Sequence, residues 1–144
     1  MKIEHRLPTA AEFIELRSQT DWVVPELSIA ETVLKRSFSG VVAIDGGQAI
    51  AMARTVGDGH LIIYIQDVIV STSHRKQGVG KRLMTALLTS LDDVCSPQCT
   101  VGLFAAIGQS GFYEKFGFNE RGNTAYGPGM HGTLSELAKL RVGA

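Results

Sequence analysis

The chain has 144 residues, of which 44% are hydrophobic and 19% charged, and its formal net charge is zero. This length is typical of one domain, which can bury about two-thirds of the surface of its unfolded chain. No apolar run approaches the roughly 20 residues of a membrane span, and the N-terminus lacks the apolar core of a signal peptide. From these absences we expect one cytoplasmic domain that does not bind membranes. The balanced charge also disfavours a nucleic-acid-binding face, so no nucleic acid is expected as a partner.

Hydrophobic periodicity and turn residues divide the chain into alternating strands and helices. In chain order these are a strand at 3–6, helices from 9 and from 28, strands at 40–45, 48–56 and 60–70, a helix from 79 to about 91, a strand at 100–105, a short helix at 109–115, strands at 118–120 and 124–126, and a helix from 133. The order predicts a mixed α/β fold, with a twisted mixed sheet of six to seven strands and flanking helices.

Local signals mark several of these boundaries. Capping boxes at 9–12 (TAAE), 28–31 (SIAE) and 133–136 (TLSE) predict three helix starts, and Gly46-Gly47 predicts a two-residue hairpin turn. The second helix is expected to bury a face with Ile29, Val33 and Leu34. The C-terminal helix is expected to pack against the body of the protein or against the partner in a homodimer.

The segment 74–83, HRKQGVGKRL, follows a long apolar strand and opens a helix. Glycines let a ligand approach the backbone, and the amides and dipole of a helix N-terminus favour an anion. Arg75, Lys76, Lys81 and Arg82 place four cationic side chains within eight residues. The segment therefore predicts a phosphate-binding loop. The alternative is a solvated helix start without a ligand.

Neither of two common phosphate-binding motifs fits this segment. A dinucleotide fingerprint needs glycine at Leu83, and a P-loop needs glycine at Arg75 and Ser or Thr at Arg82. The remaining pattern, R-x-x-G-x-G after a strand, resembles the acyl-CoA loop of the GCN5-related N-acetyltransferase (GNAT) family. A second segment, GFYEKFGF at 111–118, is similar to the family's F-Y-x-K-x-G-F motif. Both motifs in this order make the resemblance specific, and it extends from about the second strand to Gly129.

The resemblance implies that acetyl-CoA binds along the strand and the loop that follows it. Main-chain groups of a splayed strand would pair with the pantetheine arm, and loop amides would hold the pyrophosphate. The implied acetyl-CoA-binding residues are Val68, Ile69, Val70, Arg75, Lys76, Gln77, Gly78, Val79, Gly80, Lys81, Gln109 and Phe112. Gln109 stands where many relatives carry Asn, so its contact is expected to differ. No His, Cys or acidic cluster shows metal-ligand spacing, and no metal is expected.

Two residues are candidates for catalysis. Tyr113 lies where the family places a tyrosine close to the thioester sulfur, and a phenol keeps its proton at neutral pH until it can donate it to a thiolate. The alternative for Tyr113 is an aromatic core cluster with its neighbouring phenylalanines. Asp67 precedes the splayed residues and is a candidate general base, or an attractor of the cationic acceptor. Its alternative is a strand-end carboxylate bonded to nearby backbone.

The resemblance places the acceptor pocket between the first two helices. Trp22 and Glu26 lie there, although a lone tryptophan between helices is as often part of the core. The expected activity is acetyl transfer from acetyl-CoA to the primary amine of a small molecule, by direct attack in a ternary complex. The alternatives are acetylation of a protein or peptide, and a non-catalytic acyl-CoA sensor.

Overall fold

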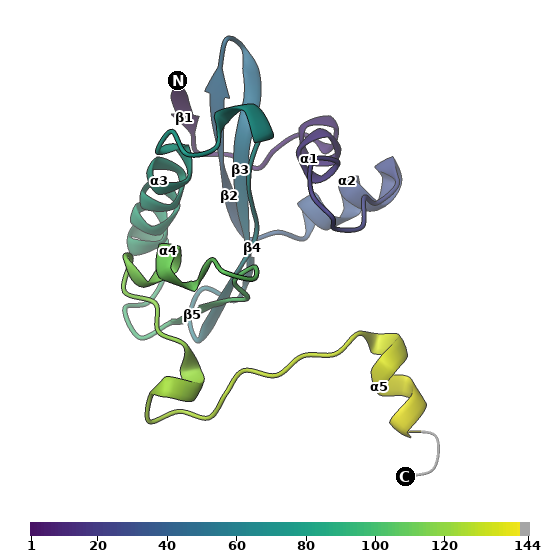
Figure 1. Ribbon diagram of the computed structural model, residues 1–144, viewed down its shortest axis with the longest axis vertical. Coiled ribbons are helices and arrows are strands. Elements are labelled where there is room, and N and C mark those ends of the chain that lie inside the picture. The colour runs from purple at the N-terminus through teal and green to yellow at the C-terminus, as the bar shows by residue number, and fades with distance from the viewer. Residues whose placement is uncertain (142–144) are drawn as a thin grey trace. The chain divides into compact units, whose positions relative to one another are not determined.

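The computed structural model describes residues 1–141, which divide after Phe104 into two compact units. The first unit contains all five strands and three of the helices (Figure 1). Its elements are β1 Lys2–Glu4, α1 Ala10–Arg17, α2 Leu27–Lys35, β2 Ser39–Asp45, β3 Gln48–Gly57, β4 Ile62–Val70, a 3-10 helix Thr72–His74, α3 Val79–Val94 and β5 Thr100–Leu103. The second unit contains α4 Ser110–Glu114, a 3-10 helix Arg121–Asn123 and α5 Leu134–Arg141.

The strands form one mixed sheet in the order β1-β2-β3-β4-β5. Neighbours from β1 to β4 are antiparallel, whereas β5 runs parallel to β4 after the crossover through α3. Helices α1 and α2 cover one face of the sheet and α3 covers the other (Figure 1). The mixed α/β architecture that the sequence predicts is therefore confirmed.

Each face of the sheet has its own apolar packing. On the α1–α2 face the buried cluster consists of Phe13, Leu16, Ala30, Leu34, Met52 and Ile69. On the opposite face α3 buries Val79, Leu83, Met84, Leu87 and Leu91. Helical spacing in the sequence predicts these residues for its core side together with Leu88, which is half-buried. Burial of one large apolar side chain contributes roughly 1.5–3 kcal/mol to the stability of the fold. Because both layers pack on the same sheet, they hold β4 and the start of α3 in place relative to each other.

The sheet has five strands rather than the predicted six to seven, because the segments 118–120 and 124–126 are not strands. Between them lies the 3-10 helix Arg121–Asn123, in which the Asn123 amide donates to the Glu120 carbonyl at 3.0 Å. The Asn123 side chain also donates to the Glu120 carboxylate at 3.0 Å. Such local side-chain bonds compete with the ladder of a strand, and the alternation of apolar residues was too short to outweigh them.

The second helix also begins differently from the prediction. Its N-cap is Glu26, with no side-chain capping bond, and Ser28 lies inside the helix. The buried residues are Ala30 and Leu34, spaced one turn apart, while Ile29 is 53% exposed. Packing of these two residues in the apolar cluster shared with α1 therefore sets this helix, and the Ser28 capping signal is wrong. The other two capping boxes and the Gly46-Gly47 turn, with φ of 54° and 79°, are confirmed.

Candidate functional site

A β-bulge interrupts β4 where the predicted site begins. Met52 pairs with Ile69 and Arg54 pairs with Gln66, so one residue of β3 lies opposite two residues of β4, Asp67 and Val68. Asp67 has a φ of 55°, in the left-handed region that aspartate tolerates better than most residues. A bulge bends its strand and increases the local twist, so β4 changes direction at Asp67.

Beyond the bulge, β4 pairs on one side only within the first unit. Its pairing with β5 runs from Ile62 to Ile65 and ends where β5 ends, at Leu103. The Ser71 amide donates to Ile50 on β3 at 2.7 Å, so the N–H and C=O of the preceding residue, Val70, point to the opposite edge. Residues 68–70, which the resemblance assigns to the pantetheine arm, thus lie on an edge that no further strand of the first unit covers.

The loop after β4 presents the start of α3 to solvent. Lys76 and Gly78 both have positive φ, 60° and 79°, and Gly78 is the N-cap without a side-chain capping bond. The first intrahelical bond is donated by the Arg82 amide to the Gly78 carbonyl at 3.2 Å. The amides at 79–81 precede that bond and have no acceptor within the helix. No acidic residue occupies the first turn, so this end of α3 is suited to an anion.

The basic side chains of the loop are exposed. Arg75, Lys76, Lys81 and Arg82 all lie at the surface, and Arg75 folds back so that its Nε donates to the Val70 carbonyl at 3.2 Å. This bond joins the loop to the open edge of β4. The loop and the edge therefore form one continuous surface within the first unit.

Asp67 is surrounded by two arginines that sequence reasoning missed. Its side chain has no exposed surface, and it forms ion pairs with Arg17 on α1 and with Arg54 Nε at 2.6 Å. The two arginine side chains are 14% and 13% exposed. Each oxygen of the carboxylate thus accepts from one guanidinium. Arg54 could have been singled out from the sequence, because it stands inside the apolar run of β3 and a buried cation needs a partner.

Arg17 extends this cluster to the loop between α1 and α2. Its Nε and Nη2 both donate to the Val23 carbonyl, at 2.9 and 2.6 Å. The guanidinium also lies 5.6 Å from the ring centroid of Phe13 and 5.7 Å from that of Trp22. Trp22 is 41% exposed, so it is a surface residue rather than part of the core. Glu26, the other predicted acceptor residue, is exposed at the N-cap of α2.

The remaining predicted residues lie in the second unit. Tyr113 and Phe112 belong to α4, and Gln109 is its N-cap. Phe112 makes edge-to-face contacts with Tyr113 and Phe116, with centroid distances of 5.0 and 5.4 Å, and Tyr113 makes one with Phe118 at 6.2 Å. The aromatic cluster considered for Tyr113 therefore exists.

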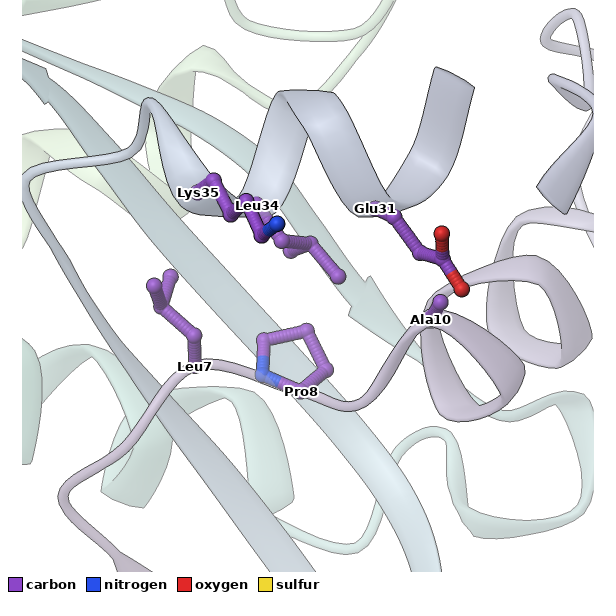
Figure 2. A pocket seen from close by; sticks show the side chains of 6 residues that line it. All are labelled: Leu7, Pro8, Ala10, Glu31, Leu34 and Lys35. Atoms are coloured by element: carbon purple, nitrogen blue, oxygen red, sulfur yellow. The ribbon is translucent and has the colours of Figure 1, made fainter. Parts of the chain in front are cut away.

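A pocket lies between α2 and the segment that leads from β1 into α1 (Figure 2). Its lining residues are Leu7, Pro8, Ala10, Glu31, Leu34 and Lys35. None of these is a predicted site residue, and the lining offers one acid and one base beside buried or half-buried apolar side chains. Across residues 1–141, no three His, Cys, Asp or Glu side chains gather as a metal site, and no helix is long and apolar enough to cross a membrane.

Comparison with known proteins relates this geometry to one family. A family model described as an acetyltransferase (GNAT) domain matches residues 36–120. A probable acetyltransferase from meticillin-resistant Staphylococcus aureus is 26% identical, with a TM-score of 0.81 over 92% of this chain and 98% of that chain. A GNAT family acetyltransferase from Streptococcus pneumoniae is 25% identical, with a TM-score of 0.77 over 92% and 96%. No curated protein matches the chain.

The fold also occurs in a structure with coenzyme A. A GNAT family N-acetyltransferase from Escherichia coli in complex with CoA is 21% identical, with a TM-score of 0.67 over 83% of this chain and 68% of that chain. At this identity the likeness concerns the fold alone.

Proposed function

Because the chain belongs to the GNAT family of acetyltransferases, we propose that it transfers the acetyl group of acetyl-CoA to a primary amine of a small molecule. The observation that carries the proposal is the continuous surface of the first unit. An open strand edge at 68–70 leads through an exposed basic loop to a helix start without a capping side chain. Extended amide groups and a pyrophosphate, which acetyl-CoA carries in this order, match that sequence of backbone donors.

Acetyl transfer requires few protein groups once the donor is held. The amine nitrogen forms a bond to the thioester carbon, the carbon–sulfur bond breaks, and the amine loses one proton while the thiolate gains one. We propose that Tyr113 supplies the proton to the thiolate. Main-chain amides near Ile69 would stabilise the thioester oxygen.

Asp67 has a different environment from the one expected for a base. Both of its oxygens already accept from guanidinium groups, and two arginines with one aspartate leave the cluster with a net positive charge. This charge opposes the attraction of an ammonium group. We therefore propose that Asp67 helps to position the acceptor and does not take its proton. Water would then accept the proton of the amine.

Direct attack by the amine is favoured over an acyl-enzyme. Both cysteines, Cys95 and Cys99, are free thiols located between α3 and β5. Burial raises the pKa of the Cys95 thiol, which lowers the fraction of the nucleophilic thiolate.

The function is tested by release of free thiol from acetyl-CoA in the presence of amines, diamines, amino acids, arylalkylamines, aminoglycosides and peptides. Turnover with a small amine supports the proposal. Turnover with peptides alone would favour a protein acceptor. Tight binding of acetyl-CoA without turnover of any acceptor would favour a sensor.

We expect Gly80→Val to weaken acetyl-CoA binding by about tenfold or more, equivalent to roughly 1.4 kcal/mol per tenfold. Gly80 lies in the first turn of α3, where a branched side chain would occupy the space that a phosphate needs near the amides. Isothermal titration calorimetry measures the effect. Gly129→Val is the matched control, because a Cβ at Gly129 meets no atom within 4 Å and the residue lies outside the loop. Equal affinities of Gly80→Val and wild type would remove the loop from the site.

A further inference from the structure

We infer that Arg17 is a positioning residue that holds the acceptor side of the site against the bulge of β4. The acceptor side is the segment 21–26, which carries Trp22 and Glu26. This inference rests on the proposed function and on the acceptor pocket that the family resemblance predicts between α1 and α2. Sequence reasoning did not single out Arg17.

The segment 21–26 is not held by burial of its own side chains. Val23 is 80% exposed, Val24 42% and Trp22 41%. Its main chain is held at Trp22 by a bond from the amide to Thr20 Oγ1 at 3.1 Å. At Val23 it is held by Arg17, which donates twice to the carbonyl while its guanidinium lies beside the Trp22 ring. A planar group with several donors in a fixed arrangement can satisfy these contacts simultaneously.

The same guanidinium fixes the segment to the strand that is proposed to bind acetyl-CoA. Its Nη1 donates to Asp67 at the bulge, one residue before the open edge at 68–70. Arg17 therefore connects the segment 21–26, proposed to contact the acceptor, with the edge of β4 that is proposed to bind acetyl-CoA. A lysine at this position has one compact ammonium group, which can pair with Asp67 but cannot also reproduce the two bonds to Val23 and the contact with Trp22.

Arg54 provides a matched control within the same cluster. It pairs with the other oxygen of Asp67, its side chain is 13% exposed, and it lies 5.9 Å from the Phe13 ring. Its Nη1 donates to Ser37 Oγ at 3.2 Å and not to the segment 21–26. Arg17→Lys and Arg54→Lys therefore disturb the same carboxylate, but only the first should release Trp22.

The test compares the two lysine variants by fluorescence and by kinetics. Trp22 is the sole tryptophan of the chain, so tryptophan fluorescence, excited where tyrosine does not absorb, reports on this segment alone. We expect stronger quenching by acrylamide in Arg17→Lys and no change in Arg54→Lys. With an accepted amine, we expect Arg17→Lys to raise the acceptor KM about tenfold, as for the loss of roughly one hydrogen bond to a charged group, with an unchanged KM for acetyl-CoA.

Equal quenching of Arg17→Lys and wild type would overturn the inference, as would equal effects of the two lysine variants. Increased quenching with an unchanged acceptor KM would also overturn it, because the segment would then be mobile without consequence for the acceptor. If wild type acetylates no amine of the panel, the proposed function fails instead, and the quenching comparison still decides whether Arg17 holds the segment.

Discussion

Replacement of Tyr113 by phenylalanine is expected to lower turnover about 10²- to 10⁴-fold, the usual effect of losing a general acid. The ring contacts with Phe112 and Phe118 do not involve the hydroxyl, so the aromatic cluster should be retained. The affinity for acetyl-CoA should hold, and the free energy of unfolding should fall by at most about 1 kcal/mol. Steady-state kinetics with an accepted amine, together with calorimetry, separates these effects.

Tyr126→Phe is the matched control for this prediction. Tyr126 lies in the same unit, is 68% exposed, and contacts Arg121 through its ring, with 5.3 Å between the guanidinium carbon and the centroid. It loses the same hydroxyl group, and its turnover should equal that of the wild type. Equal turnover of Tyr113→Phe and Tyr126→Phe would show that Tyr113 is not an obligatory acid and that water protonates the thiolate.

Replacement of Asp67 by asparagine is expected to lower the free energy of unfolding by about 3–5 kcal/mol, since it leaves two mostly buried arginines without their shared carboxylate. Asparagine has the same shape and tolerates the left-handed backbone at φ 55°, so the loss should report on charge rather than on strain. Urea denaturation measures it. Asp45→Asn is the control, because Asp45 is 48% exposed and its pair with the N-terminal amine at 3.1 Å should contribute at most about 1 kcal/mol.

The activity of Asp67→Asn distinguishes the two roles considered for this carboxylate. Loss of a general base would lower turnover most strongly below neutral pH, where the amine is mostly protonated. Loss of a positioning residue would lower turnover by the same factor at every pH. The ion pairs with Arg17 and Arg54 lead us to expect the second result. A pH profile at a temperature where the variant is folded would decide, and a selective loss at low pH would restore the role of base.

Local patterns predicted the parts of this fold that local interactions determine. The Gly46-Gly47 turn, the Thr9 capping box and the buried face of α3 depend on residues that are near in sequence, and the structure contains all three. The loop before α3 could also be located, because its glycines and cations are contiguous, and its binding of phosphate stays a prediction.

The cluster around Asp67 could not be predicted in this way. Its three charged residues come from α1, β3 and β4, and Arg17 and Asp67 are separated by 50 residues. The bulge that turns Asp67 toward the arginines results from the register of β3 and β4, which alternation alone does not define. The predicted strands at 118–120 and 124–126 are wrong for the opposite reason. Local hydrogen bonds of Glu120 and Asn123, which short apolar alternation does not indicate, determine the structure there.

The cluster around Asp67 also has a consequence for the kinetics of folding. Its ion pair between Arg17 and Asp67 needs α1 docked on the paired strands β3 and β4, whereas the pair between Arg54 and Asp67 needs only the two strands. We therefore expect the Arg17 pair to form late in folding. Interactions that form after the transition state leave the refolding rate unchanged and slow unfolding. We therefore expect the ion pair between Arg17 and Asp67 to govern how long the native state persists rather than how fast it is reached, so that its loss should shorten the lifetime of the folded chain and leave the refolding rate unchanged.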